Sequence, residues 1–272
     1  MVLLSSEAGQ HFAARMSDSG VARLTLLLDY FQPQEYGSWC GLAAAACAMN
    51  ALGGATTQAA LFEEALIVTR SATRQLAAGL SLADLETLIG RALQQQQQQR
   101  GIGPATVRKA SAADPALLTS SLDADLAEMP VAGTYSANYD SSGNVSRSAD
   151  AADAYSADPP PILLVNVLRT VKQATTGHWM LVAGSVRVGE ERWVLVLDPA
   201  AHKLGPHWLP ELTLISCMAT INFRGEPRGY LAIESGMASR DAAAGHGLER
   251  TGPPAGRGQQ EQQEDEEEFT LI

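Results

Sequence analysis

Cysteine is scarce in this sequence. The 272 residues include only Cys40, Cys47 and Cys217, and an odd, sparse count does not build the disulfide framework of small secreted domains. On one helix Cys40 and Cys47 would lie two turns apart, roughly 10 Å along the axis, which is beyond disulfide reach. We therefore expect three reduced thiols.

Long apolar runs and basic clusters are also missing. No stretch approaches the roughly 20 apolar residues of a membrane span, and residues 1–7 lack the basic start and apolar run of a signal peptide. The formal charge of -11, without clustered Lys and Arg, argues against nucleic acid as a partner. We expect a cytoplasmic protein that binds neither membranes nor nucleic acid.

The two halves of the sequence predict different secondary structure. Capping residues and helical spacing predict helices starting near Ser5, after Thr57 and after Ser81, and residues 21–30 form a further apolar segment in this mainly helical half. Branched and aromatic residues predict strands over 162–168, 178–186 and 192–197. The expected fold class is α+β, with a helical N-terminal half packed on an antiparallel, β-rich C-terminal half.

Three segments have a biased composition. A glutamine tract at 94–100 is typical of a solvated insert or a helix extension, and we assign it no function. Residues 133–161 are rich in Ser, Ala, Asp and Gly and predict a flexible loop. Residues 236–272 form a Gly-, Gln- and Glu-rich segment that we expect to be a disordered acidic tail. One domain, 1–235, remains.

The stretch from Gln34 to Asn50 contains the first candidate for chemistry. A loop runs into Cys40, and an almost wholly apolar helix is predicted from that residue onward. A helix N-terminus favours a thiolate, which is the nucleophilic form of cysteine. The Gln34 amide, six residues upstream, could join the Cys40 backbone N–H in holding an oxyanion. The alternative for Cys40 is an inert core cysteine.

A second group of candidates lies in the β-rich half. Folding the predicted hairpin about residues 188–191 places His178 opposite residues 198 to 201, and Asp198 lies in that window. A carboxylate there could accept the imidazole N–H and fix its tautomer. Taken separately, His178 could be a packed strand histidine and Asp198 a turn former. The conjunction with Cys40 and Gln34 favours catalysis.

The remaining histidines give weaker signals. His202 and His207 could be metal ligands, but they lack the spacing of a metal motif, so a surface or packing role is favoured. We expect His11 on a helix face and His246 in the tail.

Three segments together resemble the catalytic domain of phytochelatin synthases. They are Gln34–Leu52 with its Trp-Cys-Gly-Leu-Ala, Thr176–His178, and the run Leu197–Pro210 with its Asp-Pro and Pro-His-Trp. The resemblance extends from Ser5 to Tyr230.

The resemblance implies a papain-like fold with the catalytic residues Cys40, His178 and Asp198 and an oxyanion glutamine, Gln34. It also implies the reaction. The thiolate releases glycine from glutathione, holds γ-glutamylcysteine as a thioester and transfers it to a second glutathione. The chemistry requires no cofactor, although a heavy-metal ion such as Cd or Zn can arrive as a glutathione thiolate. Among partners, a homodimer of this chain is left open.

The sequence departs from the family pattern in two ways that leave alternatives open. Ala201 stands where the family usually has an arginine, and the residues after Cys217 contain none of the cysteines expected for the Cys-rich C-terminal domain of the plant enzymes. A glutathione hydrolase, with water as the acceptor, is therefore the first alternative. An inactive sensor of glutathione or metal thiolates is the second. We expect a transferase.

Overall fold

The computed structural model describes residues 1–69, 79–100, 103–111, 114–126, 138–139, 145–146, 161–171, 174–235 and 269–270. In these ranges the helices are α1 Glu7–Ala13, α2 Asp18–Leu28, α3 Cys40–Ala51, α4 Gln58–Thr69, α6 Leu82–Arg100, α7 Pro115–Leu126 and α8 Glu211–Met218. The strands are β1 Val2–Leu3, β2 Ala105–Ser111, β3 Asn138–Tyr139, β4 Val145–Ser146, β5 Ile162–Val171, β6 Ala174–Val188, β7 Glu191–Leu197, β8 His207–Pro210, β9 Gly229–Ser235 and β10 Phe269–Thr270. The predicted order, helices first and a β-rich part after them, is confirmed.

The main sheet is antiparallel and has the strand order β1-β8-β7-β6-β5-β9-β2, with β10 paired to β5. Its centre is the predicted hairpin of β6 and β7, which turns at Gly189 in a left-handed conformation (φ 65°). The register changes between Val182 and Gly184, where a bulge adds one residue to β6. The first residues of β6 are therefore shifted by one against β7.

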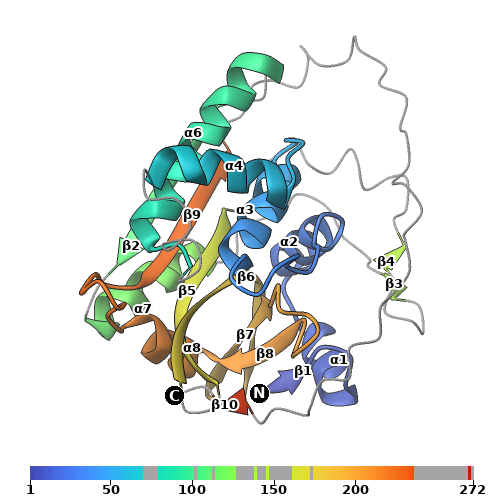
Figure 1. The fold of residues 1–272 in the computed structure, drawn as a ribbon. Helices are drawn as coiled ribbons and strands as arrows, with labels where there is room; N and C mark the ends of the chain where they lie inside the picture. The colour runs from blue at the N-terminus through green and yellow to red at the C-terminus, as the bar shows by residue number, and fades with distance from the viewer. Residues whose placement is uncertain are drawn as a thin grey trace.

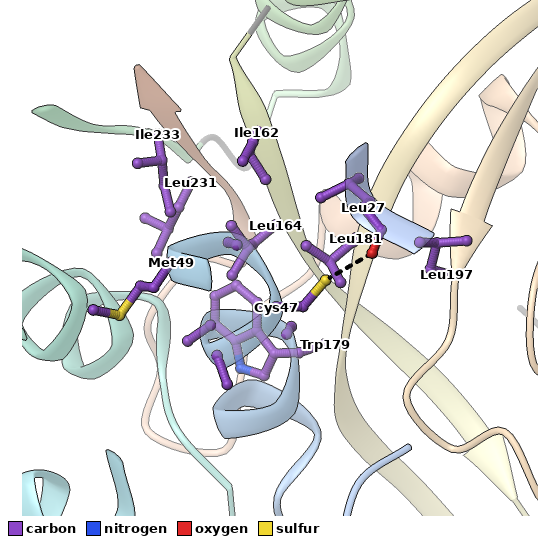
Figure 2. Packing of buried hydrophobic residues seen from close by; sticks show 14 of the residues in the cluster. Leu27, Cys47, Met49, Ile162, Leu164, Trp179, Leu181, Leu197, Leu231 and Ile233 are labelled. Carbon is purple, nitrogen blue, oxygen red and sulfur yellow. Dashed lines mark hydrogen bonds between the residues drawn. The ribbon is translucent and has the colours of Figure 1, made fainter. Parts of the chain in front are cut away.

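Helices cover both faces of the sheet (Figure 1). One hydrophobic cluster joins α2, α3, α4 and α6 to one face, and the other joins α7 and α8 to the opposite face. Figure 2 shows the first cluster, in which Trp179 and Leu181 of β6 pack against α3. The Cys47 thiol donates there to the Leu27 carbonyl at 3.4 Å. The helix that begins at Cys40 is thus packed directly on β6.

Local signals in the sequence place several helix ends correctly. The Ser6 hydroxyl accepts the Gly9 N–H at the start of α1. At the start of α6, Ser81 and Asp84 exchange side-chain and backbone hydrogen bonds, which is a capping box. Helix α3 ends just before Gly53, whose φ of 88° suits a helix end.

The sheet edges were not predicted. Strands β1 and β2 come from the N-terminal half and pair with β8 and β9. Strand β2 was missed because an exposed edge strand carries charged side chains, here Arg108 and Lys109, instead of an apolar run. The glutamine tract continues helix α6. Most of the segments 133–161 and 236–272 lies outside the described residues.

Candidate active site

Cys40 is the first residue of α3, as the sequence predicts. Its side chain is 5% exposed, and no side chain caps the amides at this end of the helix. The unpaired amides and the helix dipole give the surroundings of the sulfur a positive potential. The position therefore favours a thiolate.

His178 reaches Cys40 from strand β6. The charge of the imidazole, its hydrogen-bonding contact with the sulfur and the backbone N–H of Trp179 all act on the Cys40 thiol. Burial on its own raises the pKa of the thiol, but the charge and hydrogen bond of His178 and the Trp179 N–H outweigh it. The net result is a lowered pKa for Cys40.

Asp198 holds the other side of the imidazole. Its Oδ1 lies 2.6 Å from His178 Nε2 and accepts the Ala200 N–H at 2.8 Å, while Oδ2 accepts from Arg169 Nη1 at 3.2 Å. Since Nε2 faces the carboxylate, the second ring nitrogen, Nδ1, is the one that faces the sulfur.

The charges of this group reinforce one another. His178 is 3% exposed and Asp198 1%. Burial opposes the imidazolium, yet the charges and hydrogen bonds of Asp198 and Cys40 raise the pKa of His178 to about 9. Burial likewise opposes the carboxylate, but His178 and Arg169 lower the pKa of Asp198. The structure thus brings together a thiol, an imidazole and a carboxylate, which is the set of groups that nucleophilic catalysis by cysteine needs.

Gln34 is placed differently from these three. Its backbone N–H donates to the Pro199 carbonyl at 2.8 Å, which ties its loop to the segment that follows Asp198. Its side-chain Nε2 donates to the carbonyls of Tyr36 and Gly37 at 3.0 and 2.9 Å. The amide is thus turned toward its own loop, and its role as an oxyanion donor stays a prediction.

Packing between Gly41 and Trp179 brings helix and strand together. A Cβ at Gly41 would lie 3.0 Å from Trp179 Cδ1, so the glycine permits close contact with the indole. The indole N–H donates to the Leu80 carbonyl at 2.9 Å. Cys40 and His178 precede these two residues in the chain, so this contact fixes their separation.

Besides Arg169, which contacts Asp198, a second arginine lies next to His178 in the structure. No pattern in the sequence indicated it. Arg228 is buried, and its Nη1 donates to Asn166 Oδ1 at 2.6 Å. A Cβ at Gly177 would lie 2.5 Å from the same Nη1, so the guanidinium packs on the backbone next to His178. Within the described ranges the side-chain partner of Arg228 is the neutral Asn166 amide and not a carboxylate, and burial lowers the pKa of Arg228.

In the described part of the chain, neither His202 nor His207 is hydrogen-bonded to Cys40, His178 or Asp198. His202 is exposed, whereas His207 is buried and pairs through Nδ1 with the Gly205 carbonyl at 2.8 Å. Burial lowers the pKa of His207. Among the residues that the structure describes, no group of three or more His, Cys, Asp and Glu side chains is arranged to hold a metal ion.

Comparison with known proteins identifies the family. In the described part of the chain, no helix is both long and apolar enough to cross a membrane. No curated protein sequence matches the chain. One matching solved structure is the peptidase domain of Streptococcus ComA, a bi-functional ABC transporter involved in a quorum sensing pathway. The identity is 16%, the match covers 76% of this chain and 97% of that chain, and the TM-score is 0.38. The phytochelatin synthase family model matches residues 1–230, and the chain belongs to this family.

Proposed function

We propose that the protein is a glutathione γ-glutamylcysteinyltransferase that makes phytochelatins. The observation that carries the proposal is that His178, bonded to Asp198 at 2.6 Å, also acts on the Cys40 thiol, in a chain of the phytochelatin synthase family. A thiolate stabilised by an imidazolium suits acyl transfer through a thioester.

The first half-reaction releases glycine. The Cys40 thiolate attacks the carbonyl carbon of the cysteinyl-glycine peptide bond, and that carbonyl oxygen becomes an oxyanion. Hydrogen bonds from the Cys40 N–H and the Gln34 amide would stabilise it. When the C–N bond breaks, the His178 imidazolium donates its proton to the leaving amine. Glycine departs, and γ-glutamylcysteine is held on the sulfur as a thioester.

The second half-reaction consumes the thioester. The amino group of a second glutathione, free or carrying a metal as its thiolate, attacks the thioester carbonyl and gives up a proton to neutral His178. The C–S bond breaks, and the Cys40 thiolate is restored beside the imidazolium. Asp198 keeps the ring in place and stabilises its charge through both halves.

The buried guanidinium of Arg228 is a reason to expect an anionic substrate. Burying a cation without a carboxylate partner costs free energy, and a substrate carboxylate that enters beside the guanidinium would offset this cost. Glutathione has two carboxylates. Ala201 supplies no guanidinium from the position where the family usually has one, so Arg228, next to Gly177, is our candidate for holding glutathione.

A product analysis tests the proposal. Purified protein is incubated with glutathione, with and without cadmium, and free glycine and γ-glutamylcysteine oligomers are measured by mass spectrometry. We expect oligomers together with an equivalent amount of glycine, and neither product from Cys40→Ala. An absence of glycine under both conditions would reject the proposal.

Glutathione hydrolysis is the second candidate. Ala201 favours it, since a missing guanidinium would weaken retention of the second glutathione more than attack by water. Glycine and γ-glutamylcysteine in equal amounts, without oligomers, would identify the hydrolase.

A further inference from the structure

Gln58, the first residue of α4, has a side-chain amide that is bonded at both ends to the loop before Cys40. Its Nε2 donates to the Pro33 carbonyl at 2.8 Å, and its Oε1 accepts the Glu35 N–H at 2.9 Å. These two backbone groups lie on either side of Gln34. The side chain is 2% exposed, so both bonds are shielded from water.

The loop depends on such outside partners. Residues 31–39 form neither helix nor strand, and backbone polar groups of irregular segments must find other partners. The Gln34 N–H, between the two groups held by Gln58, donates to Pro199. The backbone around Gln34 is therefore joined to α4 on one side and to the segment after Asp198 on the other.

Helix α4 supports the other end of the same loop as well. Phe62, one turn after Gln58, stacks on Trp39 with ring centroids 4.8 Å apart and planes at 24°. Residues four apart lie on one face of a helix, so one face of α4 contacts the loop at both places. Trp39 is directly followed by Cys40.

We propose that Gln58 is a positioning residue that acts through Gln34. The inference rests on the proposed function, in which the Gln34 amide donates to the oxyanion. Because that amide bonds to Tyr36 and Gly37 in the structure, it must turn from one of these carbonyls toward the substrate. Gln58 holds the backbone from which the amide turns, whereas the Cys40–His178 pair is built by α3 and β6.

The test begins with Gln58→Met, which keeps the length of the side chain and removes both hydrogen bonds. A misplacement of about 1 Å can reduce a rate by about 100-fold, so we expect kcat for glycine release to fall about ten-fold or more. KM for glutathione and the pH profile of Cys40 alkylation by iodoacetamide should stay as in the wild type. Gln96→Met, which changes a buried glutamine of α6, is the matched control.

A second substitution separates positioning from general stability. If Gln58 acts through Gln34, Gln58→Met should cause no further loss of kcat in a Gln34→Ala background. Losses that multiply, or a Gln34→Ala protein with full activity, would overturn the inference while leaving the transferase intact. A wild-type protein that releases no glycine would instead reject the proposed function.

A conservative variant gives a readout based on proton uptake. In Gln58→Glu, a neutral carboxyl group can accept from Glu35 and donate to Pro33, whereas a carboxylate cannot donate. Burial raises the pKa of such a carboxyl group. The kcat of Gln58→Glu relative to the wild type should therefore recover as the pH is lowered toward about 5, and a ratio independent of pH would contradict the inference.

Discussion

The Cys40 thiol and the His178 imidazole shift each other's pKa, although Cys40 begins a helix of the N-terminal half and His178 lies on a strand of the C-terminal half. Each lends charge to the other: the imidazole lowers the pKa of the thiol, and the thiolate helps to raise that of the imidazole. Both pKa shifts favour a thiolate beside an imidazolium.

The ion pair predicts rapid alkylation of Cys40 in mildly acidic solution. At pH 6 iodoacetamide should label Cys40, whereas Cys47, whose burial raises its pKa to about 12, should stay unmodified. His178→Ala removes the cation and should slow labelling about ten-fold or more. Peptide mapping by mass spectrometry measures both rates. Equal rates in the two proteins would show that His178 does not activate the thiol.

Removal of the Asp198 charge should move the alkaline limit of activity. The carboxylate helps to raise the pKa of His178 to about 9, so in Asp198→Asn the imidazolium loses its proton at a lower pH. In Asp198→Asn the alkaline decline in the rate of glycine release should therefore begin at a pH below about 9. At pH 7 the rate should be about 100-fold lower than that of the wild type. Single-turnover kinetics from about pH 5 to about pH 10, the range in which His and Cys side chains titrate, give the profile.

Asp123→Asn is the control for that experiment, because Asp123 is a half-exposed carboxylate paired with Arg192. Its profile should follow the wild type. An unshifted limit in Asp198→Asn would mean that another group sets the alkaline decline.

Arg228→Gln should separate binding from stability. Loss of a charge-assisted hydrogen bond to a substrate carboxylate should raise KM for glutathione about ten-fold or more. The same change removes a buried cation without a carboxylate partner, so the free energy of unfolding should not decrease. Arg91→Gln, at a half-exposed arginine paired with Glu64, is the control. An unchanged KM would remove Arg228 from the substrate site.

Two helical glycines should respond in opposite ways to alanine. At Gly41 a Cβ would press on Trp179, so Gly41→Ala should destabilise the protein by about 1–3 kcal/mol. At Gly90 in α6 a Cβ meets open space, so Gly90→Ala should stabilise it by about 0.5–1 kcal/mol. Urea unfolding followed by Trp fluorescence measures both. A neutral Gly41→Ala would show that the indole can move without cost.

The start of a helix at Cys40 and the approach of His178 to Asp198 could each be predicted because each depends on a local pattern. An apolar run fixed the start of α3, and a hairpin with a clear turn brought His178 near Asp198. Both signals are contained in short stretches of sequence.

The environment of these residues could not be predicted in the same way. Arg228 lies in a Gly- and Pro-containing stretch typical of a surface turn, and its burial depends on how β9 pairs with β5 beside Gly177. The direction of the Gln34 amide and the bonds of Gln58 likewise depend on the packing of α4 against a loop, for which the sequence has no periodic signal.

The bulge between Val182 and Gly184 has a consequence for chain length. Side chains alternate across a strand, so one extra residue exchanges the two faces for everything on its far side. Upstream of the bulge, Trp179 faces α3 and His178 has the opposite parity. Loss of one residue at the bulge would exchange the faces of the sheet on which the Trp179 indole and the His178 imidazole lie. The end of the hairpin at Gly189 would keep its present faces. Variation in length among functional sequences should therefore accumulate at that outer turn and spare the bulge.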